Sequence, residues 1–264
     1  AWIEASGCKL SGYINCSTNT LMPTFNDVSQ SIGKLNKKEK NEMIIILTHI
    51  GGIINSDIES IAELCNKENI ILIEDCAHSF GATLDNKHSG LFGDAGVYSF
   101  YATKAIPAGE GGLVITDDEE IGDMVQQFSI YDRFDQKLNI GNNIRISEFQ
   151  ALLTLSALKE WENILQNKYK IAEHFIKICE DLDINFISQD QGGQKGNYYK
   201  FIILANSGII NNDYPKLKTK TSPVYDYALG PNIEITTCHA CLPIWYGQED
   251  KITEQVIDEL KSHF

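Results

Sequence analysis

The chain lacks several features that would place it in a broad class. No run of about 18 apolar residues is present, so we expect no membrane-spanning helix. The first residues, 1–4, show neither the basic region nor the apolar stretch of a signal peptide, and there is no initiator methionine. Positive charge is scarce, because 22 Lys and Arg face 36 Asp and Glu, for a formal net charge of −14. This balance argues against a nucleic-acid partner, and an anionic substrate would need basic groups placed locally.

Motifs for metal and dinucleotide binding are also missing. The seven cysteines include one C-x-x-C pair, Cys238 and Cys241, but no second pair of ligands at similar spacing, which a structural zinc site would need. The sequence therefore predicts a reduced, cytoplasmic protein with mostly buried thiols. No G-x-G-x-x-G follows a first strand, which argues against a nucleotide-binding oxidoreductase.

Two apolar runs predict neighbouring parallel strands. Residues 42–48 and 70–75 flank a segment in which Ser56 and Glu59 have capping-box spacing and the apolar residues share one helical face. This alternation predicts an α/β fold with a mostly parallel central sheet flanked by helices. With 264 residues, the chain is long enough for one large or two modest domains.

Other elements follow from capping signals and apolar periodicity. We expect a large domain over 1–146, a long bridging helix over 147–182 and a smaller α+β domain over 183–264. Further predictions are a strand at 12–16, a helix from Thr24 or Asn26 to Ile32, a lysine-rich loop at 34–40, a helix from 117 to 128, a flexible loop at 192–196, a strand at 198–205 and a helix over 252–264.

The stretch from 70 to 116 carries the chemistry. Its first strand ends in Asp75, a second short strand presents the hydroxyl of Ser99, and Lys104 follows before a glycine-rich segment. Ligands in open α/β sheets gather at the C-terminal ends of the strands. A carboxylate, a hydroxyl and a lysine near glycines are what a pyridoxal phosphate (PLP) site needs, because lysine forms the Schiff base and an acid keeps the pyridine nitrogen protonated. Each residue alone has a simpler interpretation, as a helix cap, a locally bonded hydroxyl or a solvated charge.

Three motifs in this stretch resemble those of a known family. Glu74–His78 matches E-D-x-A-[QH], Ser99–Lys104 matches S-F-x-x-x-K, and Gly109–Gly112 is G-E-G-G. Together they resemble the DegT/DnrJ/EryC1/StrS sugar aminotransferases, which are PLP-dependent transferases of fold type I. The resemblance implies transfer of an amino group, with glutamate as the donor, to a nucleotide-linked keto-deoxy sugar for polysaccharide or secondary-metabolite biosynthesis.

The resemblance also implies a role for each matching residue. Lys104 would carry the Schiff base and shuttle a proton, and Asp75 would pair with the pyridinium nitrogen. Ala77 would lie against one face of the ring, His78 would bond to the ring phenolic oxygen, and Ser99 would donate to the cofactor phosphate. A satisfied core histidine remains an open interpretation of His78.

A further match implies a homodimer with shared active sites. Asn143 lies in a G-x-N-x-R element, Gly141–Arg145, whose Asn reaches the phosphate of the neighbouring subunit's cofactor in the family. A simple turn is the other interpretation of this element, and Arg145 could instead anchor the loop. Near the C-terminus, Cys241–Gly247 resembles a family S-L-P-[LI]-Y-P-G element, to which we assign no chemistry.

The sequence departs from the family pattern at its start. Full-length relatives carry an N-terminal segment with a phosphate-binding Gly-Ser/Thr loop at a helix N-terminus and an aromatic residue that stacks on the cofactor. Neither is visible here, so we expect a partial sequence or a shortened protein. A non-catalytic remnant that pairs with a full-length subunit is therefore an alternative function. A sugar dehydratase of the same fold is disfavoured, because such relatives have His where this chain has Lys104.

Overall fold

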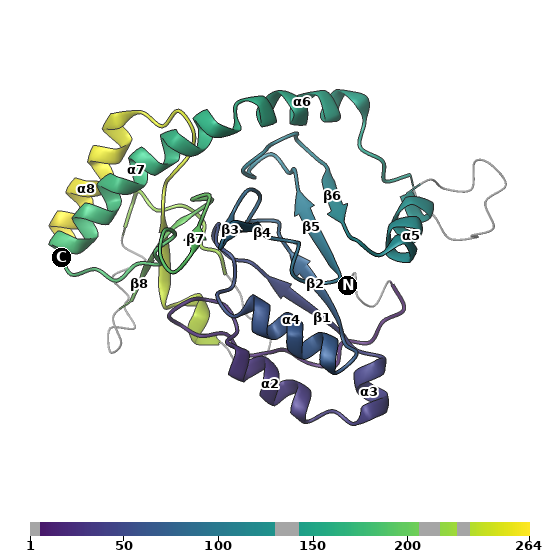
Figure 1. The fold of residues 1–264 in the computed structure, drawn as a ribbon. Helices are drawn as coiled ribbons and strands as arrows, with labels where there is room; N and C mark the ends of the chain where they lie inside the picture. The colour runs from purple at the N-terminus through teal and green to yellow at the C-terminus, as the bar shows by residue number, and fades with distance from the viewer. Residues whose placement is uncertain (1–5, 130–142, 206–216, 226–232) are drawn as a thin grey trace.

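The computed structural model describes residues 6–129, 143–205, 217–225 and 233–264 (Figure 1). Its centre is a four-stranded sheet in the order β1-β2-β5-β6. The strands are β1 (Ile44–Thr48), β2 (Ile71–Asp75), β5 (Ala95–Ser99) and β6 (Gly112–Ile115). The first three run parallel and β6 is antiparallel to β5. The predicted α/β fold with a mostly parallel sheet is confirmed.

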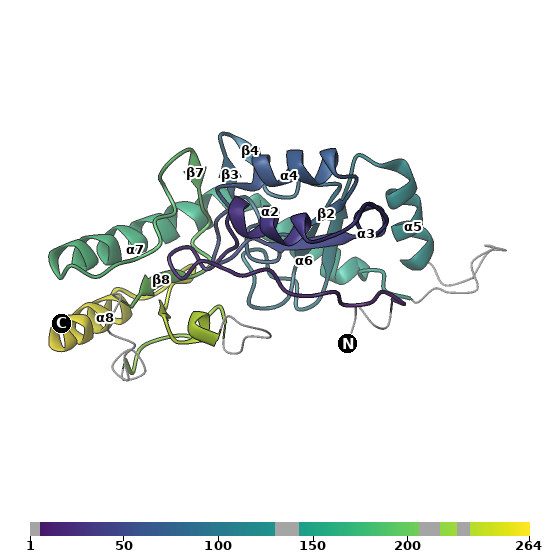
Figure 2. The same ribbon diagram turned by 90° about the horizontal axis from the view of Figure 1, so that it is seen from below.

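Helices α2 (Phe25–Gly33) and α4 (Ile58–Lys67) pack on one side of this sheet (Figure 2). Alternate strand residues point to this side, and we call it the covered face. Its apolar side chains, with those of the two helices, form one core cluster: Val28, Ile32, Ile45, Leu47, Ile54, Ile58, Ile61, Cys65, Ile70, Leu72, Ala82 and Leu84.

The opposite side of the sheet, which we call the open face, is much less covered. Ile46 of β1 is 54% exposed, whereas its neighbour Leu47 on the covered face is 2% exposed. Ile71 and Val97 are exposed as well. The open face is apolar for most of its length and ends at the C-terminal edge of the strands, where the predicted site lies.

Local capping explains where the helices around the sheet begin. Of the two predicted caps, Thr24 and Asn26, Thr24 is the one that caps α2, and it does so through a capping box with Asp27. The predicted Ser56–Glu59 box at α4 is wrong, because Asp57 is the N-cap and makes no side-chain cap bond there. Its carboxylate instead accepts a hydrogen bond from the backbone N–H of Phe25, 2.8 Å away. One side chain thus stabilises the start of α2 and joins it to α4.

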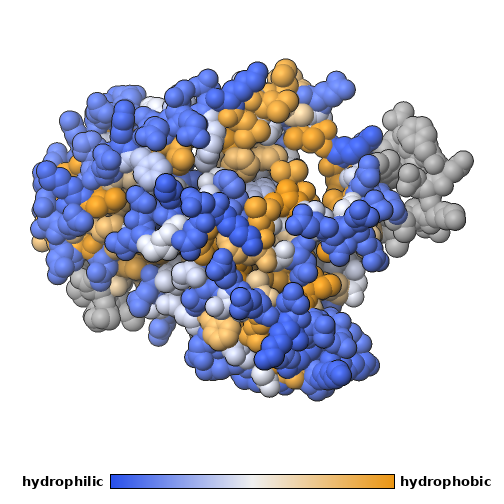
Figure 3. All heavy atoms as spheres, in the orientation of Figure 1, coloured by the Kyte–Doolittle hydropathy of each residue, from blue (hydrophilic) through white to orange (hydrophobic). Residues whose placement is uncertain are grey.

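The C-terminal part builds a second core. The region predicted as one helix over 147–182 forms two, α6 (Glu148–Lys159) and α7 (Trp161–Asp181), separated at Glu160. Helices α7 and α8 (Asp250–His263) pack on the antiparallel pair β8 (Phe201–Leu204) and β9 (His239–Leu242). Hydrophobic side chains gather over α6 (Figure 3), where Phe149 is 72% exposed. The domain boundaries stay a prediction.

The remaining elements are helix α5, of 11 residues, and several shorter ones. They are α3 (Lys37–Asn41), β3 (Thr83–Leu84), β4 (Lys87–His88), α5 (Glu119–Ser129), β7 (Gln194–Lys195) and the 3-10 helix η2 (Ile233–Thr236). Helix α3 overlaps the predicted loop at 34–40 and β7 forms inside the predicted loop at 192–196, so both loop predictions are corrected. No strand forms at 12–16, where extended chain has no ladder partner.

Buried amide side chains hold the two parts together. Gln189 donates to the carbonyls of Gly51 and Lys200, 3.2 and 2.8 Å away. Gln194 exchanges hydrogen bonds with the backbone of Ile54. Gly52 has φ +114°, and a Cβ there would collide with the side chain of Asn197. This close approach requires glycine and brings residues 189–200 against the loop after β1.

Two class-level predictions can be checked directly. In the parts of the chain that the structure describes, no helix combines the length and the apolar character needed to cross a bilayer. All seven cysteines are free thiols, as predicted.

Candidate active site

The register of β2 and β5 puts the predicted acid and hydroxyl on one face. Asp75 lies opposite Val97, and Ser99 lies two residues further along β5 on the same side. The Asp75 carboxylate accepts hydrogen bonds from the backbone N–H of Ala77, at 3.0 Å, and from the Thr48 hydroxyl, at 3.3 Å. Both groups therefore stand at the C-terminal edge of the open face, where a parallel sheet presents ligands.

Lys104 follows in the turn beyond β5. Its backbone N–H bonds to the carbonyl of Tyr101, and its ammonium lies 5.0 Å from the centre of the Tyr199 ring. Burial lowers the pKa of Lys104, and the nearby Asp75 carboxylate opposes this effect. A lowered pKa increases the fraction of neutral amine, which is the nucleophilic form.

His78 packs against the same aromatic ring. The centres of its ring and of Tyr199 are 4.3 Å apart. Burial, together with the charges of Lys104 and Lys200, lowers the pKa of His78 to about 3, so it is neutral near pH 7. Its Nδ1 is buried and has no hydrogen-bond partner among the described residues. A buried polar atom in this condition is costly, so the site fits a ligand that supplies a polar atom next to His78.

The other two predicted residues differ in their positions. Ala77 lies two residues after Asp75, and its backbone N–H donates to the Asp75 carboxylate. Asn143 is exposed, and its side-chain oxygen accepts a hydrogen bond from Arg145, 3.2 Å away. No contact joins Asn143 to the residues around Tyr199 within the described ranges, so its role stays a prediction.

Tyr199 was not predicted, yet it contacts both His78 and Lys104. Buried Asn197 fixes its position: the amide donates to the carbonyls of His78 and Phe80, each at 2.9 Å, and accepts from the Tyr199 N–H at 2.7 Å. These bonds join positions 119 and 117 residues apart in the chain. The only signal in the sequence is a polar and aromatic run before a strand, which is too common to identify a site.

Tyr225, in the C-terminal part, is partly buried, and burial, Cys16 and Asp75 all raise its pKa above the ordinary value. Its ring packs edge-on against His239, with the ring centres 6.4 Å apart. The contacts among the predicted residues and Tyr199 therefore come from two regions, the sheet edge and the segment around Tyr199.

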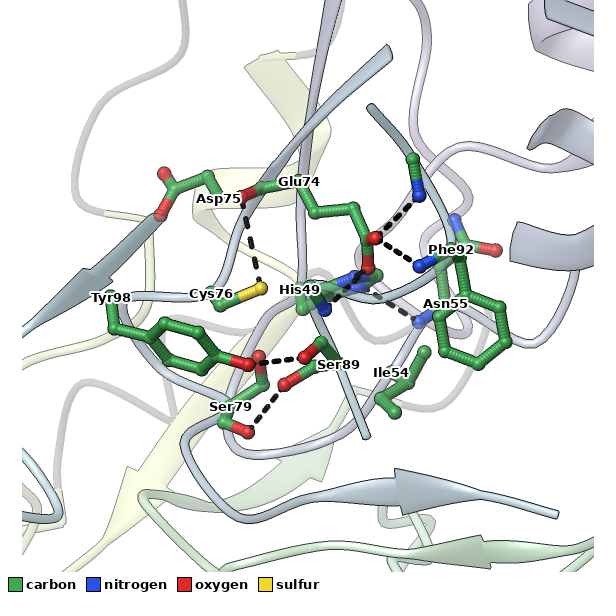
Figure 4. A network of polar contacts seen from close by, with 12 residues as sticks. His49, Ile54, Asn55, Glu74, Asp75, Cys76, Ser79, Ser89, Phe92 and Tyr98 are labelled. Carbon is green, nitrogen blue, oxygen red and sulfur yellow. Dashed lines mark hydrogen bonds and ion pairs between the residues drawn. The ribbon is translucent and has the colours of Figure 1, made fainter. Parts of the chain in front are cut away.

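Behind the site lies a saturated network around Glu74 (Figure 4). The carboxylate of Glu74 is fully buried and accepts hydrogen bonds from the backbone N–H groups of Gly90, Phe92 and Gly93 at 2.6–2.8 Å. Nε2 of His49 lies 2.8 Å from it, and Nδ1 of His49 accepts from the N–H of Asn55. That acceptor role assigns the ring proton to Nε2, which donates to Glu74.

This network accounts for a cluster that could otherwise suggest a metal site. The ligand atoms of His49, Glu74 and Cys76 lie within 4.8 Å of one another. The Glu74 oxygens are already satisfied, however. Burial, the largest single effect, opposes ionisation of Glu74, but the interactions with His49 and the backbone N–H groups together outweigh it, so the pKa of Glu74 is lowered. Burial and Glu74 raise the pKa of the Cys76 thiol to about 12, which disfavours the thiolate that a metal needs. The cluster supports the sheet edge from behind.

Comparison with known proteins identifies the family to which the sequence belongs. The model of the DegT/DnrJ/EryC1/StrS aminotransferase family matches residues 9–223. GDP-perosamine synthase of Escherichia coli O157:H7 is 29% identical over 175 residues, which are 64% of this chain and 46% of that protein. UDP-4-amino-4,6-dideoxy-N-acetyl-beta-L-altrosamine transaminase of Helicobacter pylori is 32% identical over 149 residues, 54% of this chain and 39% of that protein. The matched part thus spans less than half of either relative.

The fold is shared with solved structures. A sugar aminotransferase structure from Streptococcus pneumoniae, described as a PLP form, superposes with a TM-score of 0.81 at 17% identity and covers 98% of this chain and 76% of that one. At 17% sequence identity, the similarity to this structure shows a shared fold and nothing more. The family model, in contrast, covers most of the sequence, and the chain belongs to the DegT/DnrJ/EryC1/StrS aminotransferase family.

Proposed function

We propose that this chain binds PLP and transfers an amino group from an amino acid, with glutamate as the donor, to the keto group of a nucleotide-linked keto-deoxy sugar. The observation that carries the proposal is the convergence of Lys104 and His78 on the Tyr199 ring, beside Asp75 at the sheet edge. Membership of the family supports the reaction class, and the names of the two relatives support a nucleotide sugar as substrate.

The residues of the site fit the cofactor. The unpartnered Nδ1 of His78 can bond to a polar atom of the ring, and Ala77 leaves space for a flat ring at the strand end. The Asp75 carboxylate can hold a proton on a ring nitrogen, and the Ser99 hydroxyl can donate to a phosphate. When bound, PLP supplies an electron sink that makes the transfer of an amino group between carbon atoms feasible.

Lys104 would both carry the cofactor and move the proton. Its Nζ is the nucleophile, and its lowered pKa increases the share of neutral amine relative to an ordinary lysine. The same Nζ can take a proton from the donor carbon and return it at another position, because a general base needs a pKa near the working pH. The neutral imidazole of His78 beside it adds no charge that would compete with this transfer.

The proposal extends to assembly and location. Asn143 would reach the cofactor phosphate of a second subunit in a homodimer with shared sites, and its exposed position is compatible with such a role. A cytoplasmic location would suit the free thiols.

The absorbance spectrum of the purified chain with added PLP tests the proposal. We expect a visible band from the lysine-bound cofactor, which glutamate bleaches, and its loss in Lys104→Ala. Lys195→Ala is the matched control, because Lys195 is exposed and lies on β7. If neither the wild type nor the control shows the band, this chain does not hold the cofactor by itself, and the alternative of a non-catalytic partner subunit replaces the proposal.

A further inference from the structure

A second lysine stands at the edge of the same site. Lys200 is half-buried, and its ammonium lies 5.6 Å from the centre of the Tyr199 ring, which Lys104 also contacts. Its Nζ donates to the backbone carbonyl and the hydroxyl of Ser222, at 3.1 and 3.2 Å, and to the Thr221 hydroxyl, at 3.4 Å. These hydrogen bonds tie the ammonium to residues 221–222.

The charge of Lys200 is not neutralised by these partners. Within the described ranges, no carboxylate forms an ion pair with its ammonium, and the three acceptors are neutral. The ammonium also lies close enough to His78 to help lower the pKa of that ring. Holding a cation near Lys104 without a counter-ion is electrostatically unfavourable. The ammonium groups of Lys104 and Lys200 nevertheless both lie near the Tyr199 ring, in a chain whose net charge is −14.

The partners of Lys200 leave capacity for a ligand. A hydroxyl that accepts a hydrogen bond keeps its own hydrogen for donation. The Ser222 hydroxyl, polarised by the ammonium, can therefore donate to the same oxyanion that the ammonium attracts. Lys104 would be committed to the cofactor under the proposed function, so of the two lysines on the Tyr199 ring in the described part of the chain, Lys200 is the one available for substrate. This is the local basic group that an anionic substrate of so acidic a chain requires.

We propose that Lys200, together with Ser222, forms an oxyanion subsite of the proposed aminotransferase site. It binds an anionic group of a substrate, either the diphosphate of the nucleotide-linked sugar or a carboxylate of the amino donor. That the anion comes from a nucleotide-linked sugar or an amino donor rests on the proposed function. The chemistry of the subsite itself rests on the position of the ammonium and its neutral partners.

Equilibrium binding to the PLP-loaded protein tests the subsite. Inorganic pyrophosphate and glutarate serve as the two probes, measured by titration calorimetry at low salt. We expect Lys200→Gln to weaken the binding of one probe about tenfold or more, since a charge-assisted hydrogen bond is lost. Lys200→Arg should stay within a few-fold of the wild type, and Ser222→Ala should lose less than Lys200→Gln. The probe that loses affinity identifies the source.

Controls separate this result from failure of the proposed function. Lys195→Gln removes the same charge at an exposed position and should bind both probes like the wild type. The absorbance band should persist in Lys200→Gln, and its loss would instead assign Lys200 to the cofactor phosphate and overturn the substrate subsite. Equal binding of both probes by Lys200→Gln and wild type, or no binding by the wild type, also overturns it. If the wild type shows no band, the same titrations on the cofactor-free protein decide the subsite independently.

Discussion

Two adjacent carboxylates on β2 face opposite sides of the sheet and have opposite environments. Glu74 points into the covered face, where it is fully buried and three backbone N–H groups and His49 occupy its oxygens. Asp75 points away from that network (Figure 4) and lies partly exposed at the end of the open face. The difference teaches that the motif contains a buried, fully bonded acid beside a partly exposed one at the proposed site, and that strand alternation alone separates them.

Replacing each acid in turn by its amide tests whether Glu74 and Asp75 differ in this way. Glu74→Gln places an amide N–H₂ where backbone donors point, so we expect the free energy of unfolding to fall by about 3–5 kcal/mol. Asp75→Asn should change it by less than about 1 kcal/mol, yet abolish bleaching of the cofactor band by glutamate. Urea unfolding followed by circular dichroism measures the first effect. Equal destabilisation by the two variants would show that the two acids do not differ as described.

The same contrast extends to neighbouring apolar residues on β1. Leu47 on the covered face is 2% exposed and Ile46 on the open face is 54% exposed. Leu47→Ala should lower the free energy of unfolding by about 3 kcal/mol, because it leaves a cavity. Ile46→Ala should cost less than about 1 kcal/mol in the isolated chain. A large loss for Ile46→Ala in urea unfolding would indicate that another polypeptide covers the open face in solution.

Because of His78, which lies at the site, we expect the free energy of unfolding to depend on pH in a range where Glu74 has no effect. The folded-state pKa of His78 is about 3, below an unfolded value near 6.5, so protons bind to the unfolded state first as pH falls. Stability should therefore decrease from about pH 6.5 downward until about pH 3. Between pH 7 and pH 5 this group should cost about 2 kcal/mol in the cofactor-free protein.

Urea unfolding at pH 7 and pH 5 isolates that contribution when His78→Gln is compared with the wild type. The variant should lose less stability between the two pH values. Glu74 serves as the internal contrast, because its lowered pKa affects stability only at more acidic pH, where its stabilising charge is lost. An unchanged pH response in His78→Gln would mean that the ring is not neutral in the folded state.

The sequence predicts those parts of the fold that are set by local pattern. The buried strand ending at Asp75 is a continuous apolar run, and Thr24 caps its helix through neighbouring residues. Helix α3 was missed although Asn36 and Glu39 form a capping box, because its lysines suggest a solvated loop. The break at Glu160 has no glycine or proline to signal it, and helical periodicity continues on both sides.

The candidate site is predictable only where one continuous motif carries it. Asp75, His78 and Lys104 fall within 30 positions of one another, so their types and spacing identify them. Tyr199 and Lys200 come from a segment about 120 positions away from His78, and they join the site through the side chain of Asn197. Such long-range contacts depend on how the second core docks against the sheet. No local pattern in the sequence encodes that docking.

The position of Asn197 restricts how substrates can enter. Its one amide group satisfies two carbonyls on the sheet side and the N–H of Tyr199, and it is fully buried. A hinge motion that separated the two parts here would break the two hydrogen bonds to the carbonyls of His78 and Phe80, at about 0.5–1.5 kcal/mol each, while the local bond to Tyr199 would remain. These two bonds alone would make the separated form about tenfold less populated. Substrate exchange is therefore expected to leave this contact closed and to proceed past the exposed side of Lys200.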